Sequence, residues 1–167
     1  PAILSSAGYW GVNHIDVARK WVDVQGGALL SLVSKKLEAT GMMLENMPSF
    51  EKLSVAGAIS TASHGSSPSQ PSLSSSVLSM DLVLPNSTRV TVSKKNIKNK
   101  HHLDALMTGM GNFGFIENIV LKIVPLQRYL RSDYSIPFLV DSTFVVTAPQ
   151  QAEASSTEAS NNENNAA

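Results

Sequence analysis

The segment that decides the fold is Asn46–Ser67, which reads NMPSFEKLSVAGAISTASHGSS. From Ser54 onward nearly every residue is small or hydroxylated, so the backbone can approach a ligand closely while amides and hydroxyls donate hydrogen bonds. Backbones of this kind are typical of segments that hold phosphate or ribose groups. The apolar residues between Val55 and Ile59 would be unusual in a solvated linker. We therefore expect a buried turn or short helix within Ser54–Gly65.

A strand and a helix are predicted before this segment. Residues Trp21–Gln25 alternate between large apolar and polar side chains, as in a half-buried strand. Apolar residues then recur at helical spacing between Leu29 and Leu37. This pattern predicts a helix over Ala28–Thr40, with Gly41 placed to end it in a left-handed turn.

A hairpin, a helix and a strand are predicted after the segment. Apolar and polar residues alternate from Leu78 to Leu84, and Arg89–Val92 follows a turn at 85–87. A helix is expected over Leu103–Met110 and a strand over Phe115–Val124. Three residues of that last strand are expected in the core: Ile119, Leu121 and Ile123. The element order predicts an α+β fold with an antiparallel sheet flanked by helices.

The cluster Gly109–Gly114 reads GMGNFG and matches the G-x-G-x-x-G pattern of dinucleotide-binding loops, with Asp133 near the distance expected for a ribose-binding acid. That pattern works only between a preceding strand and a following helix. Here the predicted order is helix, glycines, strand, which is the reverse. A nicotinamide-binding Rossmann domain is therefore the least favoured interpretation.

The central segment resembles the flavin-binding segment of sugar-lactone and alditol oxidases, whose FAD-binding domain is of the vanillyl-alcohol oxidase/p-cresol methylhydroxylase (PCMH) type. In that family a serine precedes a Ser-Val-Ala-Gly-Ala run and a Thr-Gly-Thr-His-Gly-like stretch. The matching residues here are Ser49, Ser54–Ala58 and Thr61–Gly65. One departure is Ala62, where the family usually has glycine. The resemblance covers roughly Trp10–Val124 and implies the second subdomain of the PCMH-type fold.

The resemblance implies a set of FAD-binding residues, drawn from the central segment and from a second family signature that enters a strand on the adenine side of the cofactor. These residues are Ser49, Ser54, Gly57, Thr61, Ala62, Ser63, His64, Gly65, Gly114 and Ile116. Ser49 is also a candidate to face substrate. The residues identify no catalytic group and no metal site.

Composition excludes several other functions. The formal net charge is zero, so we expect no nucleic-acid partner. The chain has no cysteine, which excludes disulfides and thiolate metal sites. It has no apolar run near the ~20 residues of a membrane span and no recognisable signal peptide. Cellular location and oligomeric state stay open.

The expected organisation is a partial FAD-binding domain over 1–125, the start of a truncated substrate or cap region over 126–148, and a disordered low-complexity tail over 149–167. In the resembling family an earlier subdomain often supplies a histidine bonded covalently to the flavin. His14 is similar to it only superficially, and an ordinary strand residue is the favoured interpretation.

The resemblance implies an oxidoreductase that oxidises CH–OH groups of small sugar lactones or alditols, with hydride transfer to FAD. The alternative is a non-catalytic remnant of that fold without tight cofactor binding. Whether this chain is an enzyme stays open, and we expect the chain alone to lack turnover.

Overall fold

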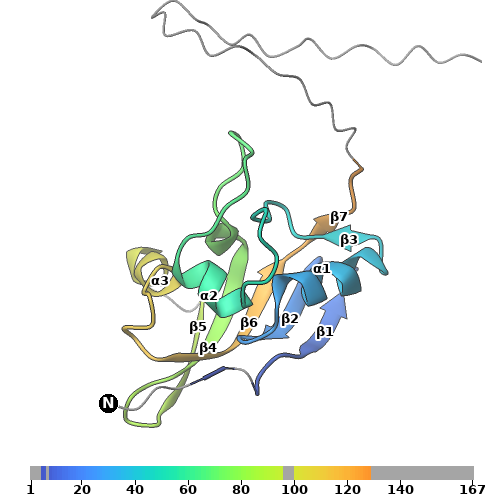
Figure 1. Cartoon of the computed structure of the whole chain (residues 1–167). Coiled ribbons are helices and arrows are strands. Elements are labelled where there is room, and N and C mark those ends of the chain that lie inside the picture. Colours follow the sequence, from blue (N-terminus) through green and yellow to red (C-terminus); the bar gives the residue numbers. More distant parts are fainter. Residues whose placement is uncertain (1–4, 7, 96–99, 129–167) are drawn as a thin grey trace, which may run out of the picture. The chain divides into compact units, whose positions relative to one another are not determined.

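The computed structural model describes residues 5–6, 8–95 and 100–128, with side chains omitted for 100–103. Its centre is a sheet whose strands are all antiparallel to their neighbours (Figure 1). In spatial order the strands are β1 (Val12–Asp16), β2 (Trp21–Gln25), β6 (Phe115–Lys122), β4 (Val77–Val83) and β5 (Arg89–Ser93). A separate pair joins β3 (Met42–Met43) to β7 (Val124–Pro125). The antiparallel α+β prediction is confirmed.

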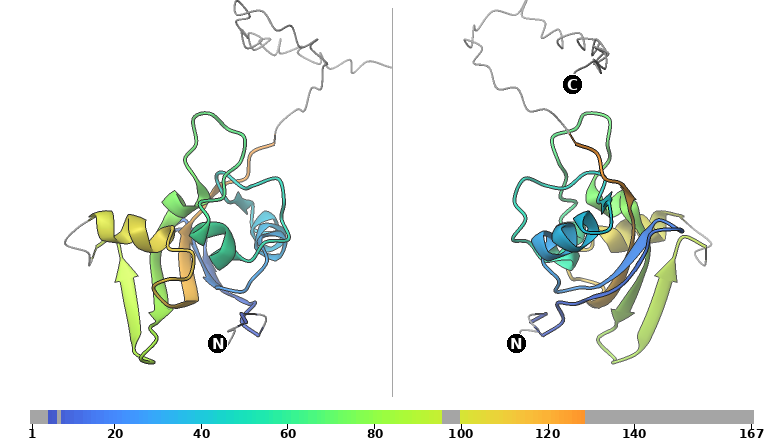
Figure 2. Two further views of the ribbon diagram at one scale, coloured as in Figure 1. Left: turned by 60° about the vertical axis from the view of Figure 1, so that its left-hand side comes forward. Right: turned by 90° about the vertical axis from the view of Figure 1, so that its right-hand side faces the viewer.

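Helices α1 and α2 pack on one face of the sheet, as the right-hand view of Figure 2 shows. The helical segments are α1 (Leu30–Glu38), α2 (Val55–Ser60), the 3₁₀ helix η1 (Leu73–Ser76) and α3 (Lys100–Met107). Apolar side chains from α1, α2 and the sheet form one buried cluster. Its fully buried members include Leu30, Leu37, Val22, Ile59, Leu121 and Ile119.

The predicted helix before the central segment is confirmed, with shorter bounds. Its first backbone N–H groups, on Leu30 and Ser31, donate to the carbonyls of Leu53 and Glu51 (2.9 and 3.0 Å). The central segment therefore replaces the side-chain cap that the sequence does not supply. Gly41 has φ +72°, as predicted for the residue that ends this helix.

Two details of β4 differ from the prediction. The predicted inward-facing set ran from Leu78 through Met80 to Leu84, but Val77 is fully buried whereas Leu78 is only partly buried. A register shift between Val77 and Ser79 reverses the alternation at this point. Such a bulge exchanges which side chain faces the core.

The Gly109–Gly114 cluster lies between α3, which ends at Met107, and β6, which begins at Phe115. The predicted order is confirmed, and the strand-then-helix setting of a nicotinamide-binding loop is not found there. His14 lies in β1, where its ring packs 5.2 Å from the ring of Trp21. It is a strand residue, as favoured. The predicted cap region, apart from residues 126–128, and the predicted tail lie outside the described residues.

Polar side chains form a hydrogen-bonded row across the sheet. Asn13 donates to Asp23 and Asn118 (both 3.3 Å), Asn118 donates to Asp81 (3.5 Å), and Thr91 donates to Asp81 (2.7 Å). Each strand contributes one residue, so the row fixes the register of neighbouring strands from outside the core.

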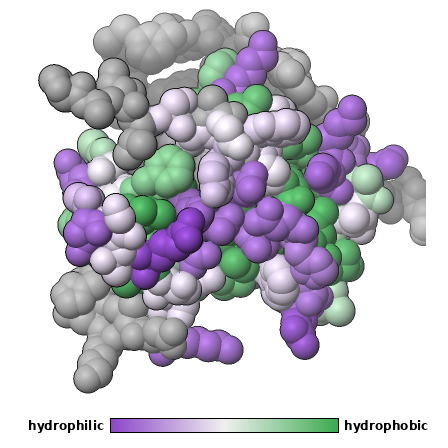
Figure 3. All heavy atoms as spheres, turned by 90° about the horizontal axis from the view of Figure 1, so that it is seen from below, coloured by the Kyte–Doolittle hydropathy of each residue, from purple (hydrophilic) through white to green (hydrophobic). Residues whose placement is uncertain are grey.

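On the face seen in Figure 3, polar and apolar residues are interleaved. Among the described residues, no helix is long and apolar enough to cross a bilayer.

Candidate functional site

Helix α2 is held at its start by the turn between β2 and α1. The N–H groups of Val55 and Ala56 donate to the carbonyls of Ala28 and Gly26 (2.8 and 2.9 Å). Ser54 caps the helix, because its Oγ accepts the N–H of Gly57 (3.2 Å). Since Oγ acts as acceptor in this bond, its own proton stays available to a ligand.

After α2 the chain turns through Ala62, which has φ +52°. This left-handed conformation is costly for any residue with a Cβ, and glycine adopts it freely. The turn is fixed by hydrogen bonds from Ala62 N–H to Ile59 O (3.0 Å) and from Ser63 N–H to Ala58 O (2.8 Å). The structure therefore explains why a glycine suits this position.

A hollow of about 430 Å³, here called the α2–turn hollow, lies between α2 and the glycine cluster. Its lining residues are Ser6, Ser54, Ala56, Gly57, Ser60, Thr61, Met110, Gly111, Gly114, Phe115 and Ile116. Gly114 has φ +146°, and a Cβ there would lie 2.6 Å from the carbonyl oxygen of Val83. A glycine is thus required for the chain to enter β6 against β4.

A second hollow of about 400 Å³, here called the His64 hollow, is lined by Met47, Ser49, His64, Gly65 and Ser66. His64 Nδ1 lies 2.8 Å from the carbonyl oxygen of Gly65. Because a carbonyl oxygen can only accept, Nδ1 is the donor in this contact. Within the described residues, the N–H groups of His64, Gly65 and Ser66 donate to no backbone carbonyl.

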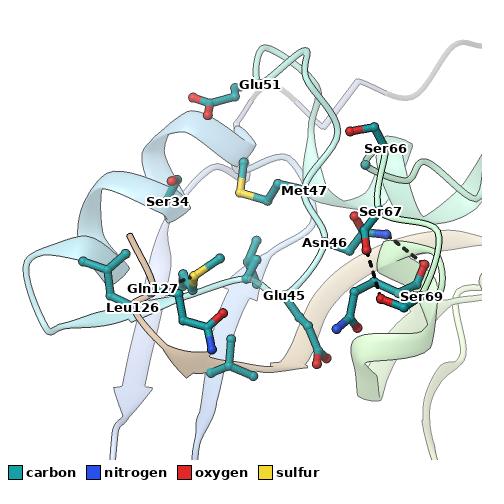
Figure 4. A pocket seen from close by; sticks show the side chains of 15 residues that line it. Ser34, Glu45, Asn46, Met47, Glu51, Ser66, Ser67, Ser69, Leu126 and Gln127 are labelled. Carbon is teal, nitrogen blue, oxygen red and sulfur yellow. Dashed lines mark hydrogen bonds between the residues drawn. The ribbon is translucent and has the colours of Figure 1, made fainter. Parts of the chain in front are cut away.

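A third hollow, of about 750 Å³, adjoins the second and shares Met47, Gly65 and Ser66 with it (Figure 4). Glu45, Asn46, Glu51 and Gln127 add polar groups to its lining, and we call it the β7 hollow. Asn46 is only 8% exposed and donates to the carbonyls of Gln70 and Pro71 (3.2 and 2.7 Å). It therefore ties the two sides of this hollow together.

Most of the predicted binding residues line the two smaller hollows. Ser54, Gly57, Thr61, Gly114 and Ile116 lie at the α2–turn hollow, and Ser49, His64 and Gly65 at the His64 hollow. Ala62 and Ser63 line neither of them. Their backbones form the turn between the residues that line the α2–turn hollow (54–61) and those that line the His64 hollow (64–66).

Gly65 has a reason to be glycine that the sequence did not show. A Cβ there would meet Asn46 Oδ1 and would lie 2.7 Å from the carbonyl oxygen of Met47. Gly65 therefore allows its backbone to approach residues 46 and 47 of the same chain closely, and this contact does not involve a ligand. Six lining residues of the α2–turn hollow are not in the predicted set: Ser6, Ala56, Ser60, Met110, Gly111 and Phe115. The last three lie in or beside the glycine cluster, whose approach to α2 could have indicated them.

Among the described residues, no group of three or more His, Asp or Glu side chains could hold a metal ion.

Residues 3–93 match the family described as "FAD binding domain". The chain belongs to this family. Its cofactor is therefore FAD, as the resemblance implied. The small residues that line the hollows, and the N–H groups at residues 64–66, which donate to no backbone carbonyl of the described residues, fit the polar, extended shape of that dinucleotide.

This FAD-binding chain is similar to enzymes of known name over about 70% of its length. It is 27% identical to the L-gulonolactone oxidase of Scyliorhinus torazame over 117 residues, which are 70% of this chain and 26% of that protein. It is 28% identical to the mitochondrial L-galactono-1,4-lactone dehydrogenase of Brassica oleracea over 123 residues, which are 74% of this chain and 20% of that protein. It is 26% identical to the alditol oxidase of a Streptomyces species over 113 residues, which are 68% of this chain and 26% of that protein.

Among solved structures, an alkyldihydroxyacetonephosphate synthase matches with a TM-score of 0.60 and 23% identity over 70% of this chain and 22% of that one. This match supports the PCMH-type fold alone. The FAD-binding chain spans between 20% and 26% of the length of the three enzymes named above.

Proposed function

We propose that this chain forms one wall of the FAD site in an oxidoreductase that removes hydride from a CH–OH group of a sugar lactone or alditol. The observation that carries the proposal is the placement of the two smaller hollows. One segment, Ser54–Ser66, lines both of them, in a chain that belongs to an FAD-binding family.

The orientation of the cofactor follows from the family signature around Gly114 and Ile116. By that resemblance the adenosine end of FAD occupies the α2–turn hollow, which leaves the His64 hollow for the flavin end. Ser54 would donate its hydroxyl to the cofactor, and Gly57 would leave room for its backbone. The N–H groups at residues 64–66, which donate to no backbone carbonyl within the described part of the chain, would bind polar edges of the flavin.

The isoalloxazine ring supplies the hydride acceptor when the cofactor is bound. The chain itself would contribute binding and orientation, with Ser49 and His64 lining the hollow proposed for the flavin end. The β7 hollow shares part of its lining with the His64 hollow, and it combines apolar side chains with carboxylates, amides and hydroxyls. Such groups hydrogen-bond to hydroxyls, which supports a substrate rich in hydroxyl groups.

The direct test is a titration of the purified chain with FAD, followed by flavin fluorescence. We expect saturable and non-covalent binding, so that precipitating the protein with acid releases the flavin into solution. With aldonolactones and alditols we expect no turnover, since one wall cannot hold substrate and cofactor in reactive geometry. No binding of FAD would overturn the proposal in favour of a remnant fold that has lost its cofactor.

A substitution at Gly57 tests the site itself. A Cβ at this residue would meet only Ser54 Oγ (2.9 Å) within 4 Å. The larger side chain of Gly57→Val would therefore extend toward the hollow and should abolish FAD binding while the protein stays folded. Ala39→Val, at an exposed residue after α1, is the matched control and should bind FAD normally. Normal FAD binding by Gly57→Val would remove Gly57 from the site.

A further inference from the structure

One wall of the α2–turn hollow comes from the start of the chain, far from the rest of the site in sequence. Ser6 lines the hollow, and its carbonyl accepts the N–H of Tyr9 (2.8 Å). The carbonyl oxygens of Ser6 and Tyr9 both lie where a Cβ on Gly27 would be. This turn therefore rests directly on the backbone of Gly27, a position that only glycine allows.

The side chain of Tyr9 connects the same turn to the part of the lining that β6 supplies. Its hydroxyl donates to Glu117 Oε1 (3.1 Å), and its ring meets the ring of Phe115 edge-on, with centroids 6.2 Å apart. Phe115 and Ile116 line the hollow, and Glu117 is the next residue of β6. Tyr9 thus joins the wall that contains Ser6 to the wall that contains Phe115.

Glu117 is held in place by a second partner. Arg89 on β5 binds it through two hydrogen bonds, Nε to Oε2 (3.1 Å) and Nη2 to Oε1 (3.0 Å). The carboxylate side chain is only 13% exposed, whereas that of Arg89 is 72% exposed. The two-bond pairing fixes the direction of the carboxylate and balances its charge beside the hollow proposed to receive the adenosine end of FAD.

We propose that Tyr9 is a positioning residue for the adenosine-diphosphate end of the cofactor. By joining Glu117 to the Ser6 turn, it sets the spacing between the two walls of the α2–turn hollow. This inference rests on the proposed function, because it takes FAD as the ligand. It adds a residue and a mechanism that the family signature does not include.

The test compares ligands that represent the two ends of FAD. ADP reports on the α2–turn hollow and FMN on the His64 hollow, each measured in competition with FAD. Tyr9→Phe keeps the ring contact with Phe115 and removes only the hydroxyl. We expect it to weaken FAD and ADP binding by the same factor, about five- to tenfold, which is the size of effect that one typical hydrogen bond supports, and to leave FMN binding unchanged.

Two further variants complete the design. Gly27→Ala should displace the turn and weaken ADP binding more than Tyr9→Phe does, provided that it folds. Trp10→Ala, at the neighbouring residue with a 60% exposed side chain, is the control and should leave all three affinities unchanged.

The outcomes separate the two proposals. Unchanged FAD and ADP affinities in Tyr9→Phe would overturn the role of Tyr9, as would an equal loss of FMN affinity, which would indicate general destabilisation. Failure of the unaltered chain to bind FAD would instead overturn the proposed function.

Discussion

Ala62 shows how a single residue shapes the site without lining it. Its φ of +52° places it in a region that costs alanine about 1–2 kcal/mol relative to the right-handed conformation. The flanking hydrogen bonds of Ala62 and Ser63 hold the turn in spite of this cost. Ala62 stands where the resembling family usually has glycine, and the backbone angle gives the reason for that glycine.

Replacing this residue should therefore stabilise the protein. We expect Ala62→Gly to raise the free energy of unfolding by about 0.5–1 kcal/mol, because relief of strain exceeds the added entropy of glycine in the unfolded chain. Urea denaturation measures the change. Ala105→Gly, at an exposed residue inside α3, is the control, and it should lower the free energy of unfolding by about 1 kcal/mol. A loss of stability in Ala62→Gly would mean that the turn is not strained.

At the scale of elements, the sequence predicted those whose pattern is local. Helix α1, strands β2 and β5 and the buried face of β6 follow from apolar spacing within each segment. Strands β3 and β7 have two residues each and exist only because Met42 pairs with Pro125 and Met43 with Val124. No local pattern encodes such a pairing between distant segments. The bulge in β4 was missed for a similar reason, since it is defined against β6.

The same distinction applies to the site. The small residues of 54–65 are contiguous, so the sequence could indicate them together. Ser6 reaches the α2–turn hollow through contacts with Gly27 and, by way of Tyr9, with β6. Contacts between segments so far apart in sequence cannot be inferred from residue types.

The cap of α2 separates a structural role from a binding role. Ser54→Ala should lower the free energy of unfolding by about 1 kcal/mol, because it removes the acceptor for Gly57 N–H. Ser54→Asp keeps an acceptor and should retain stability, yet its charge at the hollow should repel the pyrophosphate and weaken FAD binding. Denaturation and FAD titration measure the two effects. If Ser54→Asp bound FAD as tightly as the unaltered chain, the phosphates would lie elsewhere.

At the scale of the whole molecule, Gly26 is the point where the sheet and α2 meet. Its N–H donates to Glu117 O (2.8 Å), and its carbonyl accepts the N–H of Ala56 (2.9 Å). A Cβ at this residue would meet the carbonyl oxygen of Ile116. Strand β2, strand β6 and the start of α2 are therefore in direct backbone contact here.

Gly26→Ala should destabilise the protein by about 2–3 kcal/mol, because two backbones would have to separate. Differential scanning calorimetry or urea denaturation would measure it. Gly8→Ala is the matched control, since no atom lies within 4 Å of a Cβ at that residue, and its effect should stay within about 0.5 kcal/mol. Equal stability of the two variants would show that the contact at Gly26 relaxes freely.

The central position of β6 has a consequence for the order of events during synthesis. Both of its neighbours, β2 and β4, precede it in the chain, so the ribosome releases two hairpins before the strand that unites them. Until residues 115–122 emerge, each hairpin exposes an unpaired edge, and Ile116 and Phe115 are absent from the site. A nascent chain arrested before β6 should therefore fail to capture FAD. Arrival of this strand would complete the sheet and, in the same step, the wall of the proposed FAD site that this chain supplies.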